Sequence, residues 1–244
     1  VRLRDRGRGS PEAAAAQAAH DVLVGLNAPA TAVYDAALER QLGTTPSEYE
    51  RRGAAIGARV AKEVLAWRQN DGWIVTGLPP YVQPPFPGLW QKTPGVVNAA
   101  FTHLQNAAPM ALVSPTQYLP PPPPLITSEQ YATDLHEVRL LGKSDSAVRP
   151  PEQTTIARLW AGVATTGTGT ATPFPAIWNN VTRDVVLERR LSLVEAARVF
   201  VLVNVSIHDG LQTTQTSKFV YGLWRPVTAI REAESDGNPA TAGD

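Results

Sequence analysis

The sequence predicts an all-α protein whose helices are joined by long irregular connections. Three segments carry the Ser/Thr-x-x-Glu/Gln pattern of an N-terminal capping box, at 45–48, 127–130 and 192–195. Apolar residues then recur at intervals of three and four, as on the buried face of a helix. No segment alternates apolar and polar residues as a half-buried strand does, and no repeat period is visible. We therefore expect packed helices without a substantial sheet.

The composition limits the classes of function. The chain has 244 residues, long enough to bury a core without a disulfide or metal, and its 22 Lys and Arg balance 22 Asp and Glu. This balance argues against nucleic acid or an anionic membrane as an obligate partner. Without cysteine, thiolate catalysis and sulfur-bound zinc are excluded. No apolar run reaches the roughly 18 residues of a membrane span, so no membrane-spanning helix is predicted, and a homo-oligomer stays open.

Three helices are expected before residue 70. An Ala-rich run predicts the first over 11–26, and the second follows over 31–42. Thr45 is the expected N-cap of the third helix, with Pro46 at its first helical position. Its apolar stripe continues to about Arg68.

The stretch 70–127 is rich in glycine and proline, including five consecutive prolines at 120–124. Because proline breaks regular hydrogen bonding, we expect long surface loops, with one short helix starting at Thr93-Pro94. The proline run is either a spacer or a polyproline ligand for another protein, and the spacer is favoured. Aromatic side chains would anchor the loops to the helical body, namely Trp73, Tyr81, Phe86, Trp90 and Tyr118.

Four further helices are expected after the prolines. Thr127 caps one that closes at Gly142, Pro151 opens another through Trp160, and a third covers 176–190 after a Thr- and Gly-rich loop at 165–172. The capping box at 192–195 opens the last helix, which leads to Lys218. Its apolar stripe predicts that this helix is well buried, through Leu193, Ala197, Phe200, Val201, Asn204, Ile207 and Leu211.

Lys218 and Arg225 are the candidate functional residues. Lysine offers a compact ammonium and arginine a planar fork of donors, so together they suit a tetrahedral oxyanion. On a continuous helix, seven residues would rise roughly 10 Å and return to nearly the same face. The alternative is two solvated surface cations, but Trp224 and Pro226 restrict the backbone on either side of Arg225, which favours a fixed donor.

The four histidines share no metal-ligand spacing, and no metal site is predicted. His20, His103 and His136 are expected in structural or surface roles. His208, next to Asp209, is the remaining local candidate for catalysis because its helix leads to Lys218. Asp209 and Asn204 are expected to satisfy neighbouring helix ends or to support the shell of the active site, not to react.

The segment FVYGLWRPVTAIR at 219–231, with Lys218 before it, resembles the first signature of the vanadium-dependent haloperoxidase and type-2 phosphatidic acid phosphatase superfamily. That signature reads Lys, six residues, Arg-Pro. The following Asp-Gly-Asn-Pro at 236–239 is similar to the bacterial haloperoxidase-like branch. Weaker similarity covers most of the chain, at 13–26, 120–124 and 191–205. The superfamily's Ser-Gly-His block and its later Arg and His are not found before Asp244, so the sequence looks like a fragment.

The resemblance implies a helical bundle of the vanadium haloperoxidase and acid phosphatase type. Residues 1–125 would form an N-terminal helical region with a Pro-rich crossover, and 126–244 the first part of a truncated oxyanion-binding domain. Lys218 and Arg225 would be the catalytic and cofactor-binding residues that hold vanadate. In the complete protein, Lys218 would polarise bound hydrogen peroxide for attack by halide. The fragment alone is expected to be inactive, because the vanadate-ligating histidine belongs to the absent signatures.

Two other functions stay open. The same pocket suits an acid phosphatase that hydrolyses a phosphoester or diphosphate, with phosphate as a substrate moiety and no cofactor. The chain would otherwise be a non-catalytic oxyanion-binding or helical interaction module. One departure bears on the halide chemistry, since relatives commonly carry Trp and an acidic residue where this chain has Gln215 and Thr216. The chain starts at Val1 without an initiator Met, so localisation is not predicted.

Overall fold

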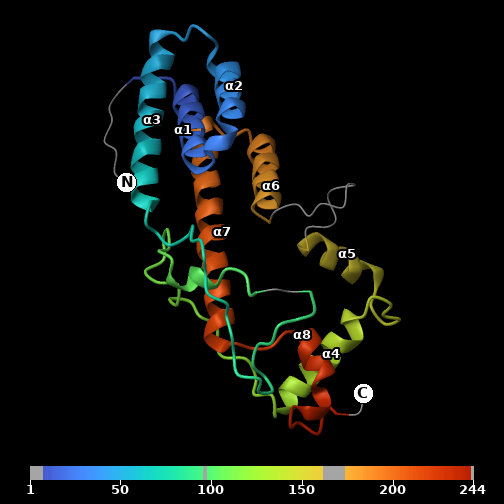
Figure 1. Ribbon diagram of the computed structural model, residues 1–244. Helices are drawn as coiled ribbons and strands as arrows, with labels where there is room; N and C mark the ends of the chain where they lie inside the picture. Colours follow the sequence, from blue (N-terminus) through green and yellow to red (C-terminus); the bar gives the residue numbers. More distant parts are fainter. Residues whose placement is uncertain (1–7, 96–97, 162–173, 243–244) are drawn as a thin grey trace. The chain divides into compact units, whose positions relative to one another are not determined.

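The computed structural model describes residues 8–95, 98–161 and 174–242, and the α-helices in these ranges are labelled α1 to α8 (Figure 1). Within these ranges the regular structure is helical, and an isolated antiparallel bridge joins Leu89 to Leu223. The all-α prediction is confirmed. The chain divides into two compact units, Val1–Asp71 with Val185–Phe200, and Gly72–Asp184 with Val201–Asp244. The functional division at residue 125 stays a prediction.

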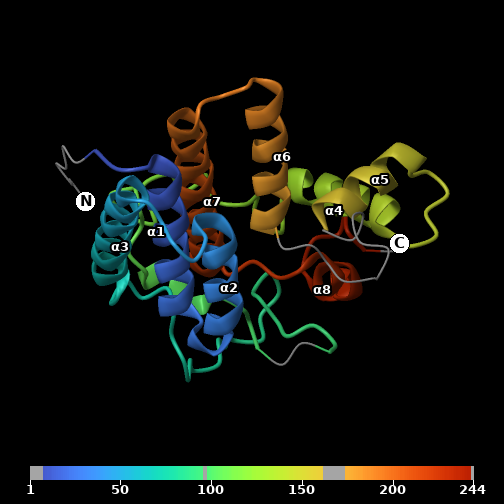
Figure 2. The same ribbon diagram turned by 90° about the horizontal axis from the view of Figure 1, so that it is seen from above.

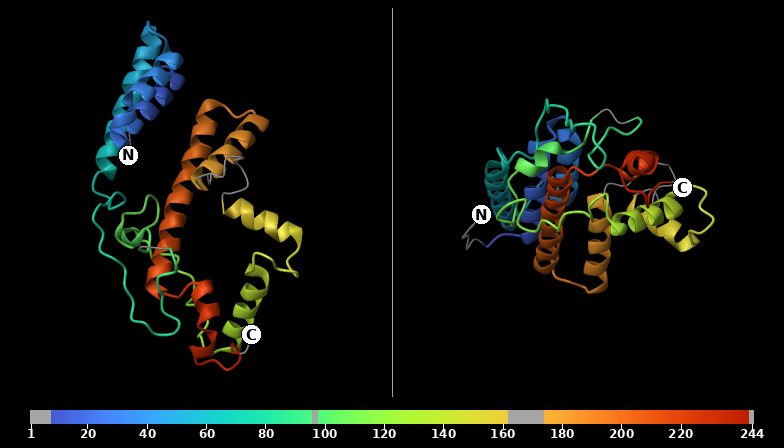
Figure 3. Two further views of the ribbon diagram at one scale, coloured as in Figure 1. Left: turned by 45° about the vertical axis from the view of Figure 1, so that its right-hand side comes forward. Right: turned by 90° about the horizontal axis from the view of Figure 1, so that it is seen from below.

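The first unit contains three helices that lie side by side, α1 (Pro11–Leu26), α2 (Thr31–Leu42) and α3 (Glu48–Arg68), with the 3-10 turn η1 (Ala28–Ala30) between the first two (Figures 1 and 3). The predicted bounds of α1 and α2 are confirmed. The predicted cap of α3 is wrong. Ser47 is the N-cap, because its backbone N–H donates to the Glu50 carboxylate at 2.7 Å while its hydroxyl accepts from the Glu50 amide. This reciprocal pair starts the helix beyond Pro46.

Small residues bring α1 and α3 into backbone contact. Gly53 and Gly57 are buried on α3, and Ala61 follows one turn later with no exposed surface. A Cβ placed on Gly57 would lie 2.2 Å from the carbonyl oxygen of Ala14, and one on Gly53 would lie 2.2 Å from that of Ser10. The two helices therefore pack at a distance that only glycine permits.

The second unit contains η2 (Thr102–Asn106), α4 (Glu129–Gly142), α5 (Pro151–Trp160), α8 (Pro226–Arg231) and η3 (Ala233–Ser235). Helices α6 (Phe174–Glu188) and α7 (Leu193–Tyr221) contribute residues to both units. The four helices predicted after the prolines are thus found, with α6 beginning and ending two residues early. In the part of the chain described, no helix is long and apolar enough to cross a membrane.

Several local predictions are corrected. Ser128 caps α4 in place of Thr127, because its side chain accepts from the Tyr131 amide. The short helix expected at Thr93-Pro94 is a turn. The capping box of α7 is confirmed, with the Ser192 amide donating to Glu195 at 2.8 Å. The loop predicted at 165–172 lies outside the described residues.

The prediction that α7 buries its apolar stripe is wrong. Val201 is 61% exposed, and the buried side chains of this helix are polar, namely Asp209, Gln212, Gln215 and Thr216. The reason is the neighbouring loop, which turns backbone groups toward the helix. The Gln212 side chain donates to the carbonyl of Leu104 at 2.9 Å and also to that of Ala107. Polar residues are needed here because buried backbone groups require hydrogen-bond partners.

A small apolar core joins α4 to α8, which lie side by side (Figure 2). Its centre is the buried side chain of Trp224, whose indole N–H donates to the Tyr131 hydroxyl at 2.9 Å. Burial raises the pKa of Tyr131, the bond from Trp224 opposes this, and the Asp236 charge adds to it. The Asn238 side chain donates to the Ile126 carbonyl at 2.7 Å, which fastens the Asp-Gly-Asn-Pro turn to the start of α4.

Three of the five predicted aromatic anchors pack as expected. Trp73 stacks on His208 with ring centroids 3.9 Å apart, while Tyr81 meets Trp90 and Phe219 edge to face at 5.3 and 4.9 Å. The prediction is wrong for Phe86 and Tyr118, which are 64% and 67% exposed. The Pro-rich segment is therefore fixed at a few points along its length.

Candidate functional site

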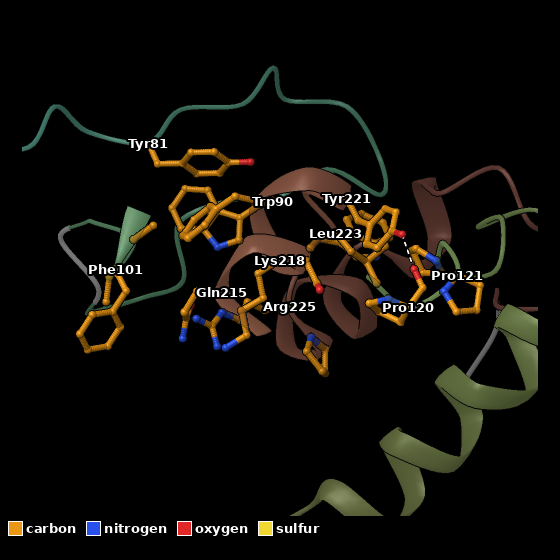
Figure 4. A pocket seen from close by; sticks show the side chains of 17 residues that line it. Tyr81, Trp90, Phe101, Pro120, Pro121, Gln215, Lys218, Tyr221, Leu223 and Arg225 are labelled. Atoms are coloured by element: carbon orange, nitrogen blue, oxygen red, sulfur yellow. Dashed lines mark hydrogen bonds between the residues drawn. The ribbon is translucent and has the colours of Figure 1, made fainter. Parts of the chain in front are cut away.

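Lys218 and Arg225 line the same cavity, which has a volume of about 590 Å³ (Figure 4). Lys218 lies in the last turn of α7, and Arg225 immediately precedes α8. The structure thus brings the two predicted residues together, but by a different route from a continuous helix. Helix α7 ends at Tyr221, and the chain then turns before Arg225.

The turn between the two cations is held by the Pro-rich loop. Gly222 has φ +56°, a left-handed conformation that favours glycine. Its carbonyl accepts from the Trp90 amide at 2.6 Å, while the Trp224 amide donates to the Gly88 carbonyl at 3.0 Å. These bonds flank the Leu89–Leu223 bridge. The loop therefore fixes the backbone that separates Lys218 from Arg225.

The backbone of Arg225 is fixed from both sides. Trp224 is only 5% exposed and belongs to the α4–α8 core. Pro226 is the first residue of α8, and Arg225 is extended with φ −77° and ψ 150°, as expected before proline. Arg225 therefore projects from a rigid attachment point, although the residue is exposed.

Among the described residues, no acidic side chain lines the cavity with the two cations. Partial burial lowers the pKa of Lys218, and the positive charge of Arg225 lowers it further. Neither side chain forms a hydrogen bond or ion pair with another residue that the structure describes. The described lining of the cavity also contains no Asp, Glu or His. A bound anion would therefore offset a repulsion that the protein leaves uncompensated.

The remaining wall is mainly aromatic and proline-rich. The Tyr221 hydroxyl donates to the Pro120 carbonyl, which holds the proline run at the cavity (Figure 4). The sequence predicted Tyr81 and Trp90 as loop anchors and the proline run as a spacer, but it missed that they line the site. Members of this wall are Tyr81, Trp90, Phe101, Pro120, Pro121, Pro123, Tyr221 and Leu223.

The two positions that depart from the superfamily pattern have different surroundings. Gln215, one helical turn before Lys218, lines the cavity and is 8% exposed. Its i, i+3 spacing to Lys218 was the sequence signal for this placement. Thr216 is 2% exposed, and its hydroxyl finds no hydrogen-bond partner among the described residues. An amide therefore stands beside Lys218 in the cavity wall.

None of the four histidines is among the described residues that line the cavity. His20 bonds Asp21 and Asp35, each at 2.8 Å, and these hydrogen bonds raise its pKa. His103 bonds the Trp73 carbonyl, and His136 is on the exposed side of α4. Among the described residues, no group of His, Asp and Glu could hold a metal ion.

His208 and Asp209 form a structural pair. His208 bonds the Asp209 carboxylate at 2.9 Å and stacks on Trp73. The same carboxylate accepts from three consecutive loop amides, of Met110, Ala111 and Leu112, at 2.8, 2.8 and 3.0 Å. Burial acts to raise the pKa of Asp209, but these amides and His208 outweigh it and lower the pKa to about 2.

Asn204 bonds the side chain of Asn179 in both directions, at 2.9 and 3.1 Å. Asn204 and Asp209 thus have the supporting contacts that the sequence suggested.

The donor set fits a tetrahedral oxyanion. An ammonium and a guanidinium share one cavity without a competing carboxylate in its described lining, and an amide stands beside them. Such charge-assisted bonds are typically about 1.5–3 kcal/mol each. The residues present can therefore hold vanadate or phosphate through oxygen atoms.

The helical fold is similar to that of a solved vanadium-dependent iodoperoxidase. A crystal structure described as that of the first bacterial vanadium-dependent iodoperoxidase matches 92% of this chain and 68% of its own, with a TM-score of 0.71 and 18% sequence identity. The predicted helical-bundle type is thereby confirmed at the level of the fold. The sequence matches no protein-family model and no curated protein.

Proposed function

We propose that this chain provides the oxyanion-binding part of a vanadate-dependent haloperoxidase-like enzyme, which oxidises halide with hydrogen peroxide. The observation that carries the proposal is the uncompensated pair of Lys218 and Arg225 in one cavity. The fold, shared with a vanadium-dependent iodoperoxidase, supports it.

In this proposal Lys218 and Arg225 hold the oxygens of vanadate, and Gln215 offers a further hydrogen bond from the α7 face. Vanadate, when bound, supplies the electrophilic centre at which peroxide becomes reactive toward halide. Lys218 keeps a positive charge at the anion and stabilises negative charge that develops there.

Phosphoester hydrolysis is the second candidate, favoured by the size of the cavity. Phosphate shares the shape and charge of vanadate, and about 590 Å³ leaves room for an organic group beside it. Either reaction needs a histidine, as nucleophile or as ligand, that the described lining does not contain. If no such histidine joins the site, the chain is a non-catalytic oxyanion-binding module.

Calorimetry with the 244-residue chain tests the site. We expect vanadate and phosphate to compete, because the donors recognise oxygen atoms and not the central element. Arg225→Ala should weaken vanadate binding about tenfold or more, since it removes a charge-assisted contact.

Arg183→Ala is the matched control, because this exposed arginine lies outside the cavity. Vanadate binding that ignores phosphate, or an unchanged affinity in Arg225→Ala, would contradict the proposal.

A further inference from the structure

We propose that the aromatic wall beside Lys218 and Arg225 is a binding shelf for the flat apolar group of an organic oxyanion ester, such as an aryl phosphate. This inference rests on the proposed oxyanion site and assigns the substrate class that the same cavity accepts.

The cavity is larger than a bare oxyanion requires. A bare tetrahedral oxyanion occupies only a small part of a cavity of about 590 Å³, and cavities of this size typically take drug-sized ligands. Lys218 and Arg225 are the only charged residues in the described lining, the polar side chains of Gln215 and Ser217 precede Lys218 on α7, and most of the remaining lining is aromatic, aliphatic or proline. An elongated ligand with one anionic end matches this distribution of charge.

The aromatic side chains of the wall are held in place by their neighbours. Tyr81 packs edge to face against both Trp90 and Phe219, and its hydroxyl accepts a bond from the Gln83 side chain. The Trp90 backbone is bonded to Gly222. These rings are therefore held in place next to Lys218 before any ligand binds, and preorganised rings lose little entropy on binding.

Phe101 presents an exposed ring to the cavity from an unfavourable backbone conformation. Its side chain is 51% exposed at the cavity, and its backbone has φ +63°, a left-handed conformation that is unfavourable for a bulky residue. Residues held in such conformations concentrate at ligand-binding sites. An exposed ring held by a strained backbone at the cavity edge fits a role in contacting the ligand.

The test compares inorganic phosphate with phenyl phosphate by calorimetry on the 244-residue chain. We expect phenyl phosphate to bind about tenfold more tightly, because its ring is buried against the shelf. Phe101→Ala should remove several-fold of this advantage and leave inorganic phosphate binding unchanged. Phe86→Ala is the matched control, since Phe86 is 64% exposed but does not line this cavity, and it should change neither affinity.

A further variant separates binding from folding. Phe101→Gly relieves the left-handed strain, so its thermal midpoint should equal or exceed that of the parent chain while the phenyl phosphate advantage falls. Equal affinities of the parent chain for the two anions would overturn the shelf and leave the oxyanion site intact. Failure to bind either anion would overturn both, and an equal loss for both anions in Phe101→Ala would reduce Phe101 to a structural role.

Discussion

At the scale of single residues, one buried carboxylate joins helix α7 to a loop. Asp209 is 4% exposed on α7 and accepts from three consecutive amides of the loop at 110–112. Burying a carboxylate or a backbone amide without a partner would destabilise the fold. Here the three amides and the carboxylate satisfy one another. The loop is thus fixed to α7 by electrostatics in a region where the helix buries polar side chains.

Replacing Asp209 by Asn should lower the free energy of unfolding by about 2 kcal/mol at neutral pH, which corresponds to the lowering of its pKa from 3.8 to about 2. Because the folded pKa is depressed, this stability is present above pH 4 and is lost as the pH falls toward 2. Urea unfolding from pH 2 to 7 measures it. Asp184→Asn, at an exposed site, is the control. If the stability of Asp209→Asn depended on pH as steeply as that of the parent chain, the pH-dependent stability would not come from Asp209.

At the scale of elements, contacts between helices rest on small residues and on single hydrogen-bonded side chains. Helix α3 presents Gly53 and Gly57 to α1, and α4 meets α8 around Trp224. Glycine normally weakens a helix by about 1 kcal/mol relative to alanine. Its presence in α3 therefore reflects the close approach of α1 and not a local preference.

Gly57→Ala should destabilise the chain by about 1–3 kcal/mol, because the new methyl group would meet the Ala14 carbonyl and force the helices apart. Gly210→Ala is the matched control in α7, where an added Cβ meets open space. The control should be neutral or stabilise by up to about 1 kcal/mol. Thermal unfolding of both variants decides, and similar effects in the two would contradict the packing argument.

The helices were predictable from sequence because caps and apolar spacing are local signals. Helices α1 and α2 fall on their predicted bounds, and the box at Ser192 forms as expected. Burial along α7 was not predictable, since two of its buried residues, Asp209 and Gln212, bond backbone groups of a loop about 100 positions away. Apolar spacing alone could not distinguish that face from the exposed one.

The candidate site was predictable in part for the same reason. Lys218 and Arg225 stood out through their local spacing and the proline after Arg225. The turn at Gly222 depends on pairing with Leu89, and the aromatic wall comes from a loop that is distant in sequence. Such long-range pairing leaves no periodic signal within a single sequence.

At the scale of the whole molecule, the chain is charge-neutral, with 22 basic and 22 acidic residues. A net field does not draw anions toward it, so the proposed recognition of an oxyanion would depend on the local pair Lys218 and Arg225. Their surroundings supply two cations and apolar surface, but the described lining lacks the histidine that halide oxidation or phosphoester hydrolysis needs.

The 244-residue chain should therefore bind vanadate without turnover. The measurement is oxidation of a phenol-red-type dye with bromide or iodide, peroxide and vanadate, alongside a longer expression product that includes any downstream histidine. Activity only in the longer product would agree with the proposed function. Vanadate-dependent turnover by the 244 residues would contradict this prediction, and His208→Ala would then test the local histidine.

If the proposed site binds an anion, the bridge between Leu89 and Leu223 makes anion affinity and loop order thermodynamically reciprocal. The bonds from Trp90 to Gly222 and from Trp224 to Gly88 fix the spacing of the two cations, so a chain with a detached loop offers a weaker site. Whatever free energy the attached loop adds to anion binding, the anion must return as resistance of the loop to detachment. A substitution remote from both cations, in the Pro-rich stretch, can thus tune the affinity without touching the ligand.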